Sequence, residues 1–267
     1  HIPVTPDRLP PLGMSPVKAM KWIAALAIVA ALVGSAAALF LWGLDAATRQ
    51  RFACPWLIYL LPLAGGAMGL YYRHLGKHIS SGNHAILGNV HKGKDTVPFV
   101  LAPSIIVATV ATHLFGGSAG REGTAVQMGA AIGSLMGKFL ATTREAGHLI
   151  MFCGIAAGFG AVYVTPFAGA VFALEFTGHS VLSRKLILCL LTALAADQVC
   201  LAWGIIHTPY PALSLAVSAK TWVSIAWKLG LAAAVFTLAS RFFVAASHFT
   251  AGKFREWFPH EALRAAV

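Results

Sequence analysis

The sequence predicts an all-α, polytopic membrane protein. Of its 267 residues, 58% are hydrophobic and only 11% are charged, and the mean hydropathy is +0.73. A water-soluble domain carries about 25% charged residues, so this chain has too few polar groups to cover a surface in water. Several apolar stretches also reach the roughly 20 residues that a helix needs to cross a bilayer.

The first two spanning helices are predicted over residues 22–44 and 52–72. Ser15 and Pro16 supply a cap and a first-turn proline before the first helix, which we expect to end near Asp45. Prolines inside the second stretch predict a kinked path, because proline removes a helix hydrogen bond. The segment that follows is too polar to span, although residues 83–90 could form a brief helix packed inside the protein.

The remaining segments are apolar but unequal in length. Residues 97–117 span, whereas 124–140 are short and carry glycines four residues apart, a spacing made for close helix contact. Proline breaks the next stretch into a helix ending near Val164 and a shorter one holding Glu175. Two further spans complete the pattern, over residues 186–206 and 223–249. Broken helices of this kind are typical of transporters and channels.

The charge pattern excludes several other classes of protein. The net charge is +11, but the basic residues fall between apolar stretches, as expected of residues that contact lipid headgroups. They form no stripe interleaved with aromatic side chains, so we expect no nucleic-acid partner. The four cysteines show no metal-binding or disulfide spacing, and the scattered histidines lack acidic or cysteine partners nearby. We therefore predict no metal and no cofactor.

The most informative stretch is Gly120-Arg121-Glu122-Gly123-Thr124, which places two charges between apolar segments. Each such charge costs roughly 2.5 to 3.5 kcal/mol in lipid, so a functional reason is expected. Glycine on both sides of the charged pair leaves the backbone N–H groups of the following helix accessible. The positive end of a helix dipole binds anions readily. The stretch predicts an anion site in which the carboxylate of Glu122 competes with the anion.

Two long motifs resemble the CLC family of anion channels and proton-coupled antiporters. Residues 113–129, HLFGGSAGREGTAVQMG, are similar to that family's signature, and residues 158–175, GFGAVYVTPFAGAVFALE, to its next block. Within the family, Thr124 in place of the commoner proline, Gly82-Asn83 and the run AWGIIHT over residues 202–208 resemble the fluoride/proton antiporter branch. The resemblance implies an inverted-repeat fold with broken and re-entrant helices. This chain would hold the first repeat and the opening helix of the second.

The resemblance also implies roles for individual residues. Glu122 would be the gating glutamate, which enters the anion path and carries the proton. Two helix ends would face the anion. One would come from Ser81, Gly82 and Asn83. The other would come from the residues around Glu122, which are Gly120, Arg121, Gly123 and Thr124. The implied activity is fluoride export in exchange for protons. The resemblance also implies a homodimer that lies in the cell membrane, in contact with lipid; in a bacterium this is the inner membrane.

The sequence departs from the family pattern at three places. His84 stands where the fluoride branch usually has a second asparagine. Phe176 aligns with the inward proton-transfer glutamate of chloride exchangers, so that route is absent, as is usual in the fluoride branch. The second repeat, with its own helix end and pore residue, does not lie in these residues. We expect residues 1–14 to be extended or disordered, and residues 15–267 to form the N-terminal half of a longer protein that does not transport alone.

Several alternatives stay open at this stage. Glu122 could be an interfacial acid that favours a helix start and pairs with Arg121. Transport of chloride, by a channel or a chloride/proton exchanger, is the nearest alternative function, and a membrane-embedded enzyme using Glu122 or the histidines is a remote one. We interpret Glu175 as a buried structural acceptor for loop amides, and Asp197 and Arg241 as buried polar contacts.

Overall fold

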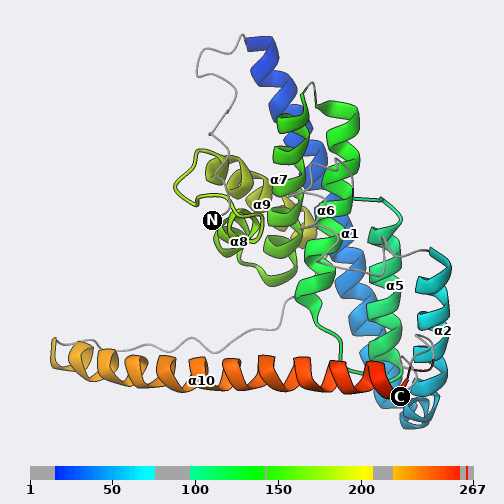
Figure 1. The fold of residues 1–267 in the computed structure, drawn as a ribbon. Helices are drawn as coiled ribbons and strands as arrows, with labels where there is room; N and C mark the ends of the chain where they lie inside the picture. The colour runs from blue at the N-terminus through cyan, green and yellow to red at the C-terminus, as the bar shows by residue number, and fades with distance from the viewer. Residues whose placement is uncertain (1–15, 76–96, 142, 207–218, 259–262, 264–267) are drawn as a thin grey trace.

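The computed structural model describes residues 16–75, 97–141, 143–206, 219–258 and 263. All regular secondary structure in this part of the chain is helical, which confirms the predicted all-α class (Figure 1). Its helices are α1 (Pro16–Ala53), η1 (Pro55–Leu60), α2 (Leu61–Leu75), α5 (Leu101–Leu114), α6 (Arg121–Leu140), α7 (Arg144–Tyr163), α8 (Pro166–Phe176), α9 (Lys185–Ala202) and α10 (Ala219–Trp257).

Four helices in the described residues are long and apolar enough to cross a bilayer. They are Ala19–Ala53 of α1, α7, α9 and Trp222–Trp257 of α10, whereas α5 and α8 are apolar but shorter. Large apolar side chains on these helices point outward, among them Trp42, which is 66% exposed. Exposed apolar surface on this scale suits contact with lipid rather than water. The predicted pattern of unequal membrane helices is therefore confirmed.

The first helix is longer than predicted. We expected it to end near Asp45, but α1 continues to Ala53. The added turns are held in part by an ion pair between Asp45 and Arg49, one helical turn apart, at 2.6 Å. With 38 residues, α1 is about 57 Å long, nearly twice the roughly 30 Å of bilayer hydrocarbon.

The second predicted span contains a full break instead of a kink. The chain leaves α1 at Cys54 and forms the 3-10 helix η1, with Pro55 at its first position, before α2 begins at Leu61. Proline cannot donate the hydrogen bond that would continue α1. Pro62 is tolerated at the second position of α2, where backbone N–H groups have no partner within the helix.

Glycines bring α6 and α7 into backbone contact, and this is the most extensive helix pair in the structure. A Cβ on Gly133 would lie 2.9 Å from Met151 Cα, and one on Gly137 would lie 2.9 Å from Gly147 O. A Cβ on Gly129 would overlap the carbonyl group of Gly154. Side chains are excluded at these positions, which confirms the predicted close-contact face.

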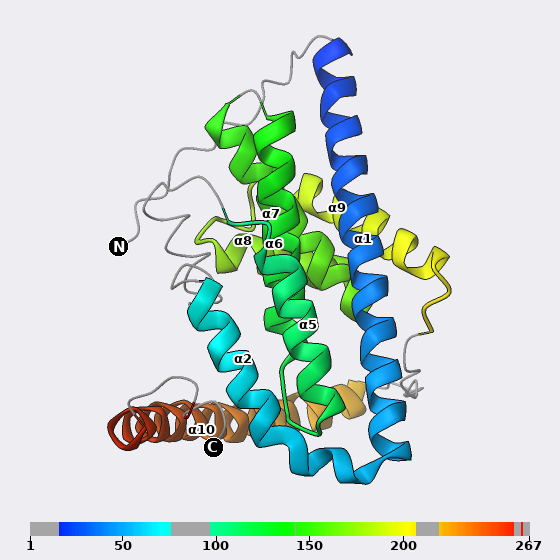
Figure 2. The same cartoon turned by 90° about the vertical axis from the view of Figure 1, so that its right-hand side faces the viewer.

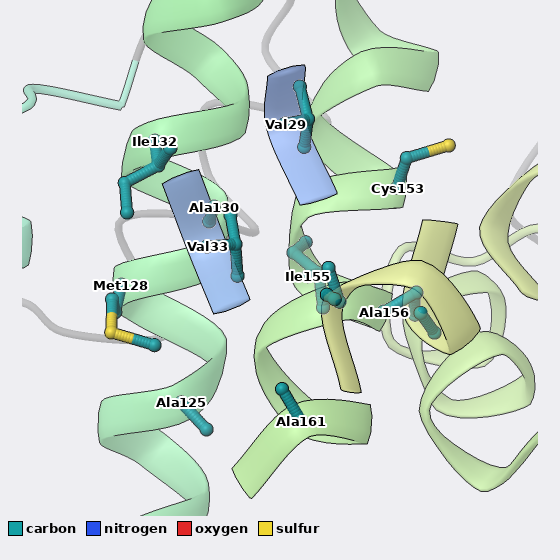
Figure 3. Close-up of a cluster of buried hydrophobic side chains, with 14 of the residues drawn as sticks. Val29, Val33, Ala125, Met128, Ala130, Ile132, Cys153, Ile155, Ala156 and Ala161 are labelled. Carbon is teal, nitrogen blue, oxygen red and sulfur yellow. The ribbon is translucent and has the colours of Figure 1, made fainter. Parts of the chain in front are cut away.

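The core lies around α7, which packs against α1, α6, α8 and α9. Small and branched side chains fill it, and Figure 3 shows Val29 and Val33 of α1 beside residues of α6 and α7. Across the α7 and α9 contact, the sulfur atoms of Cys153 and Cys189 are 3.9 Å apart, and both residues are fully buried. Cys200 is also a buried thiol, whereas Cys54 is only partly buried.

The turn between α7 and α8 lies where the sequence predicts it. Val164 adopts the left-handed region with φ of 56°, and Thr165 N–H donates to the carbonyl of Gly160 at 3.1 Å. Pro166 then begins α8, and proline disfavours a helical conformation in the residue before it. The two helices therefore meet at a sharp corner.

The last helix, α10, lies apart from the others. It extends away from them in Figure 1, and none of the 18-residue stretch that marks it as a membrane span is buried. Arg241 is exposed on it, so the predicted buried contact for this residue is wrong for the described chain. The charge lies on a helix that has no packed neighbour among the described residues.

Candidate functional site at the start of α6

The helix α6 begins part-way along the bundle. After α5 ends, residues 115–120 run back alongside it, so that α6 starts within the span of its neighbours (Figure 1, Figure 2). The turn out of α5 uses Gly116 at φ of 79°, and its N–H donates to the carbonyl of His113 at 3.1 Å. This path places the charged residues Arg121 and Glu122, both exposed in the described chain, in the first turn of α6.

Gly120 caps α6 without a side chain. It has φ of −70° and ψ of 139°, a conformation open to any residue, so its backbone does not require glycine. A Cβ at this position would lie 3.0 Å from Oε2 of Glu122, the far end of an exposed side chain that can move aside. The carboxylate of Glu122 thus bends back over the first residue of the helix, where the helix dipole favours negative charge.

Four backbone donors are available at this helix end. The N–H groups of the cap and the first three residues of an α-helix have no partner within the helix, and here they belong to Gly120, Arg121, Glu122 and Gly123. Glu122 is exposed and Gly123 is half-buried in the described chain. Among the described residues, no ion pair joins Glu122 to Arg121. The carboxylate is therefore free to leave the position over Gly120.

Thr124 lies on the other side of the helix end. Its side chain is 1% exposed, and its Oγ1 is 2.7 Å from Oγ1 of Thr109 in α5. Its own N–H is the first in α6 that can reach a helical acceptor, the carbonyl of Gly120. The hydroxyl of Thr124 thus contacts a neighbouring helix, and its predicted contact with an anion stays a prediction.

The segment before α6 is held on several sides. The guanidinium of Arg51, at the end of α1, lies against Gly116, where a Cβ would be 2.5 Å from its Nε. The N–H of Gly117 donates to the carbonyl of Thr112 at 2.8 Å, and a Cβ there would be 3.0 Å from the side chain of Leu61. Sequence reasoning missed Arg51 and Thr109, since each is an isolated polar residue without a motif around it.

The sequence also predicts site residues outside the start of α6. Ser81, Gly82 and Asn83 lie outside the described residues, as does His84. Glu175 is exposed in the described chain, and its backbone carbonyl accepts a hydrogen bond from Gly178 N–H at 3.0 Å. The expectation that Glu175 is a buried acceptor is therefore wrong for this chain.

Asp197 in α9 is 5% exposed, and Gln198 Nε2 donates to its Oδ2 at 3.4 Å. The predicted burial of this acid is confirmed.

No cluster in the described ranges could hold a metal ion. Within 16–75, 97–141, 143–206 and 219–258, no three side chains of His, Cys, Asp or Glu come together. The chemistry available at the start of α6 consists of backbone N–H groups, one carboxylate and a helix dipole. These groups can bind a small anion and exchange a proton, which is the behaviour expected of an ion pathway.

Comparison with known proteins agrees with this chemistry. Residues 64–267 match the family model for voltage gated chloride channels. A chloride/fluoride channel protein of Pseudomonas syringae pv. tomato is 42% identical over 229 residues, covering 85% of this chain and 50% of that protein. A crystal structure of a CLC-type fluoride/proton antiporter superposes with a TM-score of 0.80 at 25% identity, covering 94% of this chain and 63% of that one.

These comparisons fix the class of the protein. The chain spans about half the length of the curated relative. The predicted CLC-like helical architecture is confirmed over most of the chain. The match to a family of channels and transporters also confirms the prediction that the chain is not an enzyme. The chain belongs to the voltage-gated chloride channel (CLC) family of integral, multi-pass membrane proteins.

Proposed function

We propose that the complete protein exports fluoride in exchange for protons across the cell membrane. In a bacterium this is the inner membrane. The observation that carries this proposal is the carboxylate of Glu122, whose Oε2 lies over the N-cap Gly120 at the start of α6. The Pseudomonas relative is named a chloride/fluoride channel, and the structural neighbour is a fluoride/proton antiporter, so both names support an anion as cargo.

One side chain couples the two ions in this proposal. Ionised Glu122 occupies the position that an anion would take beside the free N–H groups of α6. Protonated Glu122 has no charge to hold it at the helix dipole, so it leaves and an anion enters. The ionised carboxylate excludes the anion, and the protonated carboxyl admits it. Proton uptake and anion entry are therefore linked by a coupling free energy.

Partial charges suit this task better than a full positive charge. Backbone N–H groups replace part of the water that a small anion loses, yet they release it more readily than a lysine would. Gly120, Arg121 and Gly123 supply such groups at the start of α6. In the complete protein, the segment with Ser81, Gly82 and Asn83 would supply a second set. The proposed assembly is a homodimer in which each subunit has its own path.

Liposomes that contain the complete protein test this role for Glu122. We expect Glu122→Gln to abolish proton-coupled fluoride efflux, measured with a fluoride electrode and a pH indicator, while anion binding measured by calorimetry persists. Glu145→Gln is the matched control, because Glu145 is the second residue of α7 as Glu122 is of α6, and it is also exposed. Proton-coupled efflux that is unchanged in Glu122→Gln rejects the proposed gate.

Chloride transport is the second candidate function. It is favoured by the name of the Pseudomonas relative, which includes both halides. The same liposomes, loaded with either salt, separate the two candidates by the ratio of the initial rates. Fluoride that leaves no faster than chloride would contradict fluoride export while keeping Glu122 as the gate of a chloride pathway.

A further inference from the structure

We propose that Thr109 and Thr124 form a hydroxyl clamp that fixes the start of α6 against α5 and thereby sets the size of anion that the site accepts. This inference rests on the proposed function, since it assigns a selectivity device to the same helix end. Neither hydroxyl touches the anion in this proposal. Thr109 is a positioning residue that acts through Thr124 on the N–H groups ahead of it.

The two hydroxyls face one another in a dry contact between helices. Their Oγ1 atoms are 2.7 Å apart, and the residues are 4% and 1% exposed, respectively, for Thr109 and Thr124. A hydrogen bond that water cannot reach has no competing partner, so it holds its geometry better than one at a surface. The backbone of Thr109 is also engaged, because Nδ1 of His113 lies 2.9 Å from its carbonyl oxygen.

Either hydroxyl could donate to the other, and the bond from Thr124 to Gly120 selects one direction. Thr124 Oγ1 donates to the carbonyl of Gly120 at 3.4 Å, which leaves its lone pairs for the hydroxyl of Thr109 as donor. The chain of bonds therefore runs from α5 through Thr124 to the cap residue of α6. It ends on the same residue that Oε2 of Glu122 covers.

This arrangement depends on a hydroxyl at residue 124. Proline has neither a hydroxyl nor an N–H, so with proline there Gly120 would lose both bonds to its carbonyl and α5 would lose its lateral bond. With threonine, the first turn of α6 is held along the helix by the bonds from Thr124 to the carbonyl of Gly120. It is held across the helix by the bond from Thr124 to Thr109. Binding groups that cannot move apart favour a small anion, because a larger one must push them outward.

Conservative variants of the complete protein in liposomes separate selectivity from stability. Thr109→Val keeps the shape of the side chain and removes the donor, and we expect it to raise the ratio of chloride to fluoride flux about tenfold. Thr109→Ser restores the hydroxyl and should restore the original ratio. Thr192→Val is the matched control, because Thr192 is 2% exposed and, in the described chain, its hydroxyl donates within α9 to Leu188 O at 2.7 Å.

Each result decides the proposal. A ratio that changes in Thr109→Val but not in Thr192→Val supports the clamp, whereas equal loss of both fluxes or an unchanged ratio overturns it. If Thr109→Val does not fold, the double variant Thr109→Val with Thr124→Val removes both hydroxyls and leaves no buried donor unpaired, and its ratio is read in the same way. Failure of the proposed function is distinct, since it shows as flux that does not depend on Glu122 in the parent protein.

Discussion

Replacing Gly133 with alanine tests whether glycine contacts hold α6 in place. Gly133 is buried against α7, and the added Cβ would lie 2.9 Å from Met151 Cα, 3.0 Å from Ile150 O and 3.2 Å from Gly154 Cα. All three atoms belong to the backbone, so no side chain can rotate to make room. Carbon atoms in contact normally stay about 3.5 to 4.0 Å apart, so the two helices must separate by about 0.6 Å or more.

The expected cost follows from this overlap. Inserting a methyl group into a well-packed core costs about 1 to 3 kcal/mol, and a rigid backbone contact belongs at the upper end. Alanine regains up to about 1 kcal/mol of helix propensity over glycine, so the net loss in unfolding free energy is about 2 kcal/mol. For a protein about twice the length of this chain, like the curated relative, such a loss lowers the melting temperature by roughly 2 °C.

The assay compares melting temperatures of the complete protein in detergent, followed by circular dichroism. Gly147→Ala is the matched control, because it lies in the same helix pair but its Cβ would find only ordinary contacts, 3.7 Å from Ala141 Cβ and 3.9 Å from Gly137 O. We expect the control to melt at or slightly above the parent temperature. Equal melting temperatures for Gly133→Ala and Gly147→Ala would refute the close-contact argument.

Three further substitutions have expected effects on the melting temperature in the same detergent assay. Val164→Gly should raise it, because a left-handed Val costs about 1 to 2 kcal/mol and this side chain is 43% exposed; a lower value contradicts the strain. Ser134→Ala should lower unfolding free energy by about 1 to 3 kcal/mol, since it strips the buried Val97 N–H of its 2.9 Å acceptor, and no change would show another acceptor. Thr143→Ala should cost about 1 kcal/mol through loss of the cap bond from Ala146 N–H at 3.2 Å, whereas Thr143→Ser should not.

The sequence predicts the parts of this fold that depend on local chemistry. Glycines four residues apart identify the face of α6 that meets α7, and Pro166 marks the corner after Val164. Both signals work because one residue type has a single dominant physical effect. The charged stretch around Glu122 is found for the same reason, since an acid in an apolar chain is costly wherever the chain folds.

Features that depend on distant partners are not predictable in this way. Thr109 looks like any threonine in an apolar helix until α6 brings Thr124 beside it, 15 residues later. Glu175 and Arg241 have the same sequence signal as Asp197, an isolated charge in an apolar stretch, yet only Asp197 is buried in the described chain. Burial of a charge is decided by which helices pack around it, and hydrophobic pattern alone does not specify that.

Two separate constraints position Glu122, and they should fail in different ways. Gly129 and Gly133 set how closely α6 approaches α7, whereas Thr124 sets how its first turn sits against α5. Gly129 is five residues beyond Thr124, or about 7.5 Å along the helix, so a shift at the glycine face moves the whole helix end as one piece. Such a shift should reduce flux of both halides together, because every N–H group moves by the same amount. Loss of the proposed clamp should change the spacing between the N–H groups. We therefore expect a changed ratio of chloride to fluoride flux in variants of Thr109 and not in variants of the glycines.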